Sequence, residues 1–131
     1  MACFDIDRFK RVNDEFGHEI GDRVLEHLGA VLTAETRATH VVGRMGGEEF
    51  VVLLPGYPDH DTQAFAERVR ARFAEAGPLP RVTLSAGVSS AVAPPAGALL
   101  IAESDAALYA AKRAGRDRTV VASEREVVAA G

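Results

Sequence analysis

Apolar residues recur at the spacing of an α-helix in several parts of the chain. The clearest case is 21–36, where apolar side chains three or four positions apart form one stripe. This stripe consists of Val24, Leu25, Leu28, Val31 and Leu32. A second stripe, within 61–76, consists of Phe65, Val69 and Phe73. Helices are therefore predicted over four ranges, namely 8–16, 21–36, 61–76 and 98–114.

Residues that favour helix ends flank these predicted helices. Gly17 and Gly115 each follow one, at the position where a left-handed residue commonly ends a helix. Asp61 is predicted to cap the third helix, and Gly77 and Pro78 to end it.

Strands are predicted between the helices. Apolar residues alternate over 81–89, and shorter apolar runs indicate strands over 2–6 and 119–122. Two more apolar runs predict a hairpin over 41–54, while Pro-rich and Gly-rich segments at 55–58 and 94–97 indicate turns or loops.

The centre of the predicted hairpin carries Gly46 and Gly47, followed directly by Glu48 and Glu49. Tight two-residue turns need a positive φ, which glycine adopts at little cost, and a turn without side chains also lets a ligand approach the backbone. The simplest alternative is an ordinary hairpin with two solvated glutamates.

Strands interleaved with helices, together with one hairpin, indicate an α+β fold. We expect a mixed, mainly antiparallel sheet flanked by helices, of the ferredoxin-like or palm type. One domain is predicted over 1–122, and 123–131 is predicted to be a flexible tail.

Composition narrows the classes of function. The 131 residues carry a net charge of −4, which argues against broad nucleic-acid binding. The single cysteine, Cys3, has no internal disulfide partner and lies in an apolar run, so it is interpreted as a small buried residue. Neither a membrane segment nor a signal peptide is recognised in the sequence, and a cytoplasmic location is expected.

Acidic and basic residues suggest a site for a phosphorylated ligand. Asp5, at the end of the first predicted strand, could meet Glu48 and Glu49 across the sheet, and carboxylates are the hard ligands that Mg²⁺ prefers. The cationic candidates for binding phosphates are Lys10, Lys112 and Arg116. The alternative for these cations is a solvated helix end, where positive charge complements the helix dipole.

Asn13 and Asp22 are candidates for recognition of a guanine edge. An amide offers a donor and an acceptor, and a carboxylate accepts from two N–H groups. The simplest alternative for Asp22 is a residue at a helix start, where its charge complements the helix dipole. The alternative for Asn13 is a residue that ends a short helix.

Four blocks of the chain resemble the GGDEF family, in family order and over nearly the whole length. They are Asp5-Ile6-Asp7-Arg8-Phe9-Lys10-Arg11-Val12-Asn13-Asp14 with Phe16-Gly17-His18 and Gly21-Asp22, Arg44-Met45-Gly46-Gly47-Glu48-Glu49-Phe50, Thr83-Leu84-Ser85-Ala86-Gly87-Val88, and Ser104-Asp105-Ala106-Ala107-Leu108-Tyr109-Ala110-Ala111-Lys112-Arg113-Ala114-Gly115-Arg116. Members of this family are diguanylate cyclases, which condense two GTP into cyclic di-GMP, and their fold resembles nucleotidyl-cyclase palms.

The resemblance implies a metal site for Mg²⁺, with Mn²⁺ as a substitute. Asp5, the carbonyl of Ile6 and Glu48 would be ligands, with Glu49 as a further one. Glu48 would also assist loss of the 3′-hydroxyl proton, and Lys10 would stabilise the transition state.

The resemblance also implies roles in nucleotide binding. Asn13 and Asp22 would bind guanine, Gly46 and Gly47 would let the hairpin pass against the nucleotide, and Phe9 would belong to the same site. The phosphates would be bound by Lys10, Lys112 and Arg116. Because one domain holds one GTP, a second copy of the domain is implied for catalysis, and a sensor or regulatory partner lies outside this sequence.

Two departures from the family pattern matter. Members with a product-inhibition site carry Arg-x-x-Asp, but here Arg37 is followed by His40 in place of the acid, with Arg68 as a possible further contact. We therefore expect weak product binding there. The usual helix ahead of the first strand is also missing, which predicts a less stable domain, an exposed apolar patch or a partner that covers it.

Two rival functions stay open at this stage. One is a catalytically impaired domain that binds GTP or cyclic di-GMP and regulates a partner, which the short N-terminus favours. The other is a dimerisation or interaction domain without a nucleotide, which leaves the three polar clusters unexplained.

Overall fold

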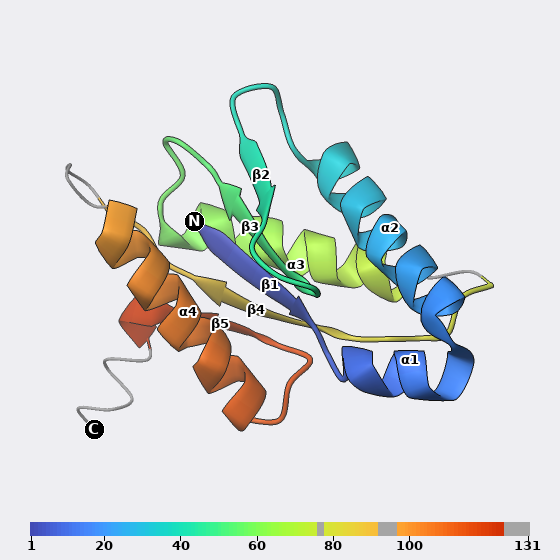
Figure 1. Ribbon diagram of the computed structural model, residues 1–131. Helices are drawn as coiled ribbons and strands as arrows, with labels where there is room; N and C mark the ends of the chain where they lie inside the picture. The colour runs from blue at the N-terminus through green and yellow to red at the C-terminus, as the bar shows by residue number, and fades with distance from the viewer. Residues whose placement is uncertain (76–77, 92–96, 125–131) are drawn as a thin grey trace.

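The computed structural model describes residues 1–75, 78–91 and 97–124. A five-stranded sheet in the order β2-β3-β1-β4-β5 forms its centre, with β4 and β5 parallel and the other pairs antiparallel (Figure 1). The elements are β1 (Ala2–Ile6), α1 (Phe9–Phe16), α2 (His18–Glu35), β2 (Val41–Arg44), β3 (Glu49–Leu53), α3 (Asp59–Ala74), β4 (Leu84–Val88), α4 (Gly97–Arg113) and β5 (Thr119–Val121). This arrangement confirms the predicted α+β fold.

The central strand β1 is buried on both faces, and its side chains point alternately to the apolar core and to the face that α4 covers. Phe4 points into the apolar core, where its ring packs edge-on against Phe65 of α3. On the other face, Cys3 and Asp5 point toward α4, which lies in front of the sheet in Figure 1 while α3 lies behind it. The predicted helical stripes supply the core, because Val24, Leu28, Val69 and Phe73 are all buried.

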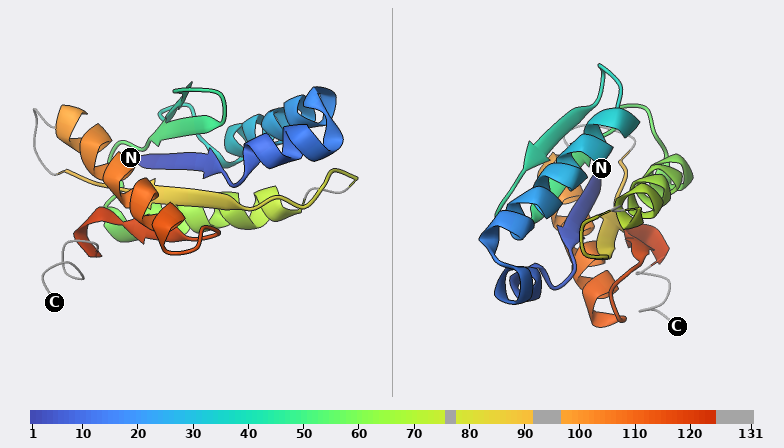
Figure 2. Two further views of the ribbon diagram at one scale, coloured as in Figure 1. Left: turned by 60° about the horizontal axis from the view of Figure 1, so that its bottom comes forward. Right: turned by 90° about the vertical axis from the view of Figure 1, so that its right-hand side faces the viewer.

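Helix α4 lies unusually close to β4, and Gly87 allows this approach. A Cβ built at Gly87 would overlap the carbonyl oxygen of Ser104 and the backbone nitrogen of Leu108. Strand β4 is consequently buried along both faces, instead of having one buried face as its alternating pattern suggested. The two views in Figure 2 show α4 crossing the sheet on the side opposite α3.

Helix boundaries differ from the prediction by more than one residue at two N-termini. Helix α2 begins at His18 because Gly17, with φ of 89°, already turns the chain, and Gly21 lies inside the helix. Helix α3 begins at Asp59 after Pro58, so the prediction that Asp61 caps it is wrong. Asp61 lies in the first turn, where its charge still complements the helix dipole.

At the other helix ends, one prediction agrees and one does not. Gly115 follows α4 with φ of 122°, as expected of a residue that ends a helix. Helix α3 ends at Ala74, two residues before its predicted end at 76. Gly77, most of the predicted 94–97 loop and 125–131 of the predicted tail lie outside the described residues.

Large apolar side chains are exposed mainly at two places. They belong to the edge hairpin and to α4, namely Val41, Val42, Met45, Leu53, Leu99, Ile101 and Tyr109, with Phe16 on α1. Among the described residues, no helix combines the length and apolar character needed to cross a membrane.

Candidate active site

The turn between β2 and β3 is longer than the predicted two-residue turn. Strand pairing ends at Arg44 and Phe50, and Met45 N donates a hydrogen bond to Glu49 O at 2.9 Å. Neither Gly46 nor Gly47 has a positive φ, so the prediction that they serve a tight turn is wrong. The guanidinium of Arg44 instead donates to the carbonyl oxygens of both glycines and holds the turn in shape.

The surface above this turn is open. A Cβ at Gly46 or Gly47 would meet no atom within 4 Å. A ligand can therefore approach the backbone at both positions, which was the second reason to expect glycine there.

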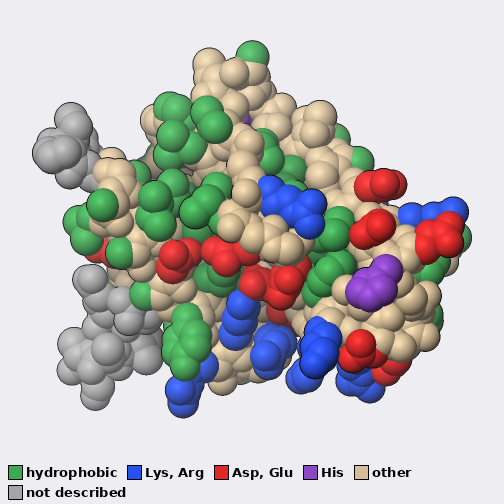
Figure 3. Space-filling view, in the orientation of Figure 1, with side chains coloured by type: hydrophobic (Ala, Val, Ile, Leu, Met, Phe, Trp, Pro, Cys, Tyr) green, Lys and Arg blue, Asp and Glu red, His purple; other side chains and the backbone are tan. Residues whose placement is uncertain are grey.

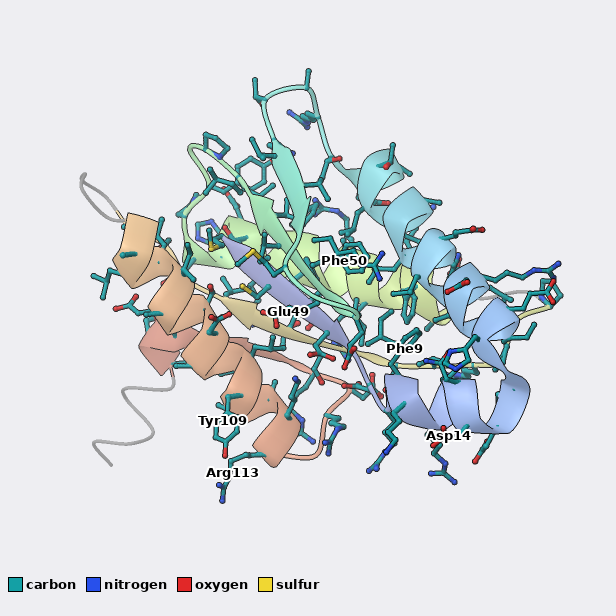
Figure 4. All side chains as sticks on the ribbon, viewed as in Figure 1. Phe9, Asp14, Glu49, Phe50, Tyr109 and Arg113 are labelled. Atoms are coloured by element: carbon teal, nitrogen blue, oxygen red, sulfur yellow. The ribbon has the colours of Figure 1, made fainter. Side chains whose placement is uncertain are left out.

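Strand β1 and the hairpin meet where both carry acidic residues. Asp5 pairs with Glu49 in antiparallel register, and Ile6 N donates to Glu48 O at 3.2 Å. The structure thus brings the backbones of all four predicted metal-binding residues side by side. Glu49 lies on the face of the sheet that α4 covers (Figure 4).

Asp5 has a cationic partner in Lys112, from the last turn of α4. The Nζ of Lys112 lies 2.6 Å from Oδ2 of Asp5, and the two side chains are 33% and 11% exposed. Among the described residues, Asp5, Glu48 and Glu49 do not form a set of oxygens within 4.8 Å of one another. The side-chain oxygens of the predicted trio therefore do not converge in this structure, in which Asp5 pairs with the ammonium group of Lys112.

The side chains that do converge are Cys3, Glu49 and Asp105, with one potential ligand atom of each within 4.8 Å of the others. Burial, followed by the nearby carboxylates of Asp105 and Asp5, raises the pKa of Glu49. Burial also raises the pKa of the Cys3 thiol to about 11, and this thiol donates to Ser104 Oγ at 3.0 Å. Cys3 is thus the buried neutral residue that was predicted, whereas the contact between Glu49 and Asp105 was not foreseen.

The predicted guanine-binding residues lie where α1 and α2 approach each other. A Cβ at Gly21 would overlap Oδ1 of Asn13, and it would also lie within 3.4 Å of the Phe9 ring. Gly21 therefore makes room for two predicted site residues at once. Asn13 is half-buried, and Phe9, which Figure 4 labels at the start of α1, is buried.

Asp22 is the residue of α2 that follows Gly21, and it lines a surface cavity of about 330 Å³. Leu25, Glu26, Arg44 and Phe50 complete this lining. The cavity lies between α2 and the hairpin. Within its lining, Cζ of Arg44 lies over the Phe50 ring, 5.7 Å from the ring centre. Sequence reasoning assigned no site role to Arg44, although the residue is part of the hairpin motif.

The predicted phosphate-binding residues come from two segments. Lys10 is exposed in the first turn of α1, whereas Lys112 and Arg116 lie at the end of α4 and just beyond it. Figure 3 shows acidic side chains across the middle of this face and basic side chains along its lower edge. A polyphosphate with a divalent cation would find both signs of charge here.

The residues predicted for a degenerate product-inhibition site lie away from the glycine turn. Arg37 and His40 precede β2, and Arg68 belongs to α3. Nδ1 of His40 accepts a hydrogen bond from the backbone N–H of Arg37 at 3.0 Å, and the His40 ring packs edge-on against Tyr57. Arg37 and Arg68 line one cavity of about 590 Å³ together with Glu35, which also forms an ion pair with Arg68. His40 serves its local turn and brings no negative charge to the arginines.

Sequence reasoning missed Asp7, which is buried directly after β1. Its carboxylate accepts hydrogen bonds from Thr83 Oγ1 at 2.7 Å, Ser85 Oγ at 2.6 Å and Asp117 N at 3.0 Å. The sequence signal was the second acid of Asp5-Ile6-Asp7, but nothing local to Asp7 shows which distant groups it binds.

Comparison with known proteins gives one consistent family. Residues 1–118 match the family model for "Diguanylate cyclase, GGDEF domain". The chain is 44% identical over 128 residues to diguanylate cyclase DgcP of Pseudomonas aeruginosa, covering 93% of this chain and 19% of that protein. It is 42% identical over 124 residues to diguanylate cyclase DgcM of Escherichia coli K12, covering 93% of this chain and 30% of that protein. The chain therefore spans less than a third of either relative.

Solved structures agree with the family match. The active GGEEF domain of a diguanylate cyclase from Vibrio cholerae superposes with a TM-score of 0.85 at 40% identity, covering 92% of this chain and 80% of that one. The GGDEF domain of DgcB from Caulobacter crescentus, in complex with c-di-GMP, gives a TM-score of 0.86 at 31% identity, covering 93% and 76%. Diguanylate cyclase SiaD of Pseudomonas aeruginosa, in complex with its activator SiaC, gives 0.82 at 39% identity, covering 92% and 48%.

Proposed function

Because this chain belongs to the GGDEF family of diguanylate cyclases, we propose that it condenses two molecules of GTP into cyclic di-GMP. In each half of the reaction, the 3′-oxygen of one GTP forms a bond to the α-phosphorus of the other. The bond from that phosphorus to the β-phosphate oxygen breaks, and pyrophosphate leaves. The 3′-hydroxyl proton passes to Glu48 or, through it, to solvent.

The observation that carries this proposal is the junction between β1 and the hairpin. The hydrogen bond from Ile6 N to Glu48 O, together with the Asp5–Glu49 pair, puts an acidic strand end next to an acidic turn. The glycines beside this junction leave the surface open to a nucleotide.

The donor set fits a divalent cation such as Mg²⁺. Asp5, Glu48, Glu49 and the Ile6 carbonyl offer only oxygen ligands, and Asp5 already binds a positive group, the ammonium of Lys112. When bound, such a cation would polarise the phosphate and lower the pKa of the attacking hydroxyl.

The remaining residues bind and orient the nucleotide. Lys10 and Arg116 neutralise charge on the triphosphate, and Lys112 would do the same if a bound cation replaced its contact with Asp5. Asp22 accepts from the N–H groups of the guanine edge, and the Asn13 amide both donates to it and accepts from it, beside the ring of Phe9.

A complete reaction requires two copies of the domain facing each other, because each site holds one GTP. The rate should therefore rise more steeply than in proportion to protein concentration. A partner protein is also proposed to control the activity, since the related SiaD was solved with its activator.

Incubation with GTP and Mg²⁺, followed by chromatographic separation of the nucleotides, tests the proposal. Cyclic di-GMP should form with the wild type and should be lost with Glu48→Ala. Glu19→Ala, which removes an exposed glutamate from the first turn of α2, is the matched control and should retain activity. Magnesium-dependent GTP binding without any product would reject the cyclase in favour of a binding module.

A further inference from the structure

A buried carboxylate ties the end of β1 to the loop that follows α4. Asp7 is 6% exposed, and its three hydrogen-bond donors come from the segment before β4, from β4 itself and from the backbone N–H of Asp117. An ionised carboxylate accepts hydrogen bonds and donates none, so all three contacts suit it. The loop beyond α4 is thereby attached two residues from Asp5, the first predicted metal ligand.

Asp117 is held from a second direction by Arg70 of α3. The Arg70 Nη2 lies 2.7 Å from Asp117 Oδ1, and its Nε donates to the carbonyl oxygen of Leu84 at 2.9 Å. Glu67 accepts from the third nitrogen of the guanidinium, Nη1. Arg70 is only 13% exposed, and its planar group bridges α3, β4 and the loop at once.

The loop held in this way has a left-handed backbone at residues other than glycine. Arg116 has φ of 64° and Asp117 has φ of 48°, directly after Gly115. Such conformations are unfavourable for most residues with side chains and persist where surrounding contacts hold them. Here the contacts are those of Asp117 with Asp7 and Arg70, and the bond from Arg116 N to Ala111 O at 2.9 Å.

Arg116 lies in this turn directly before Asp117. It is half-buried, and within 1–75, 78–91 and 97–124 its guanidinium takes part in no recorded hydrogen bond or ion pair. A guanidinium without a protein partner, on a backbone fixed from two sides, is prepared to bind an anion.

Resting on the proposed function, we propose that Asp117 is a positioning residue for the triphosphate. Clamped between Asp7 and Arg70, it fixes the left-handed turn that presents Arg116 to the phosphates. Arg116 makes the contact, and Asp117 acts only through it.

A double-mutant cycle on nucleotide binding tests this role. The ligand is 3′-deoxy-GTP with Mg²⁺, which lacks the attacking hydroxyl and cannot be turned over, and affinity is measured by isothermal titration calorimetry. Arg116→Ala should weaken binding about tenfold, the loss typical of one charge-assisted contact. Asp117→Gly keeps the freedom to adopt the turn but loses the ion pair, and should weaken binding about fivefold.

Two further variants separate positioning from general destabilisation. Asp117→Asn keeps an acceptor for Arg70 and tolerates the left-handed backbone, so it should bind within about twofold of the wild type. The combination of Arg116→Ala with Asp117→Gly should bind no more than about twofold more weakly than Arg116→Ala alone. If Asp117→Gly does not fold, Arg70→Lys, which loses the planar fork, replaces it in the cycle.

The outcomes separate failure of the proposed function from failure of the role proposed for Asp117. Absence of 3′-deoxy-GTP binding by the wild type would overturn the proposed function and this inference with it. Normal binding by Asp117→Gly, multiplying effects in the double variant, or an unchanged affinity of Arg116→Ala would overturn the inference alone.

Discussion

The ion pair between Lys112 and Asp5 leads to a prediction about metal binding and stability. Replacing Lys112 by methionine keeps the length of the side chain but removes the ammonium group 2.6 Å from Oδ2 of Asp5. Without a divalent cation, Asp5 is then left 11% exposed, and among the described residues no other cationic side chain forms an ion pair with it. The folded state should lose stability.

The size of the loss follows from the geometry. At 2.6 Å and an effective dielectric constant of ~20, two unit charges attract by roughly 6 kcal/mol before dehydration is subtracted. Breaking a fully buried pair costs ~3–5 kcal/mol and breaking an exposed one ~0–1 kcal/mol. Because Lys112 is 33% exposed, the expected loss lies between these limits, at about 2 kcal/mol of unfolding free energy. For a domain of this size, that corresponds to about 8 °C in Tm.

Thermal unfolding followed by circular dichroism, with chelator or with Mg²⁺, measures both effects. Mg²⁺ should raise the Tm of Lys112→Met more than that of the wild type, because in the variant it has no ammonium to displace from Asp5. Lys10→Met is the matched control, since Lys10 is exposed and its loss should cost less than ~0.5 kcal/mol. Equal stability of wild type and Lys112→Met in chelator, or equal stabilisation of both by Mg²⁺, would refute this reasoning.

Two further predictions concern Glu49 and Gly87. Burial and the Asp105 carboxylate raise the pKa of Glu49 above its ordinary 4.5, so this group's favourable contribution is complete below that pH and is lost as pH rises through the folded-state pKa. In urea unfolding, the free energy of unfolding of Glu49→Gln relative to wild type should therefore be higher at pH 7 than at pH 4. A difference that is the same at both pH values would contradict this prediction. Gly87→Ala should lose about 3 kcal/mol of unfolding free energy because the new Cβ overlaps backbone atoms of α4. The control Gly29→Ala, with open space around this position of α2, should gain up to ~1 kcal/mol. Equal effects of the two substitutions in the same assay would count against close packing at Gly87.

The hairpin shows where local chemistry misleads. Gly46 and Gly47 suggested a tight turn because glycine is the usual residue at positive φ, yet both have ordinary φ values. The turn is shaped instead by hydrogen bonds from Arg44, a side chain whose direction the glycine pattern does not specify. The hairpin itself was predicted correctly, because the two apolar runs on either side of the turn form the paired strands β2 and β3.

The core strand was predicted well for a similar reason. Strand β1 was predicted from the short apolar run over 2–6, and such a run is a local property of the chain. The α3 stripe and the glycine after α4 are equally local signals, and the structure has them where they were expected.

By itself, the sequence determined the order and type of the elements, the buried stripes and the set of polar residues that are proposed to bind a nucleotide. Only the tertiary structure decided which of those residues meet. Lys112 reaches Asp5 across 107 positions of chain, and Asp7 binds Asp117 across 110. Local spacing sets which side of a helix or strand a residue occupies, but partners this far apart depend on strand register and on how closely α4 packs at Gly87.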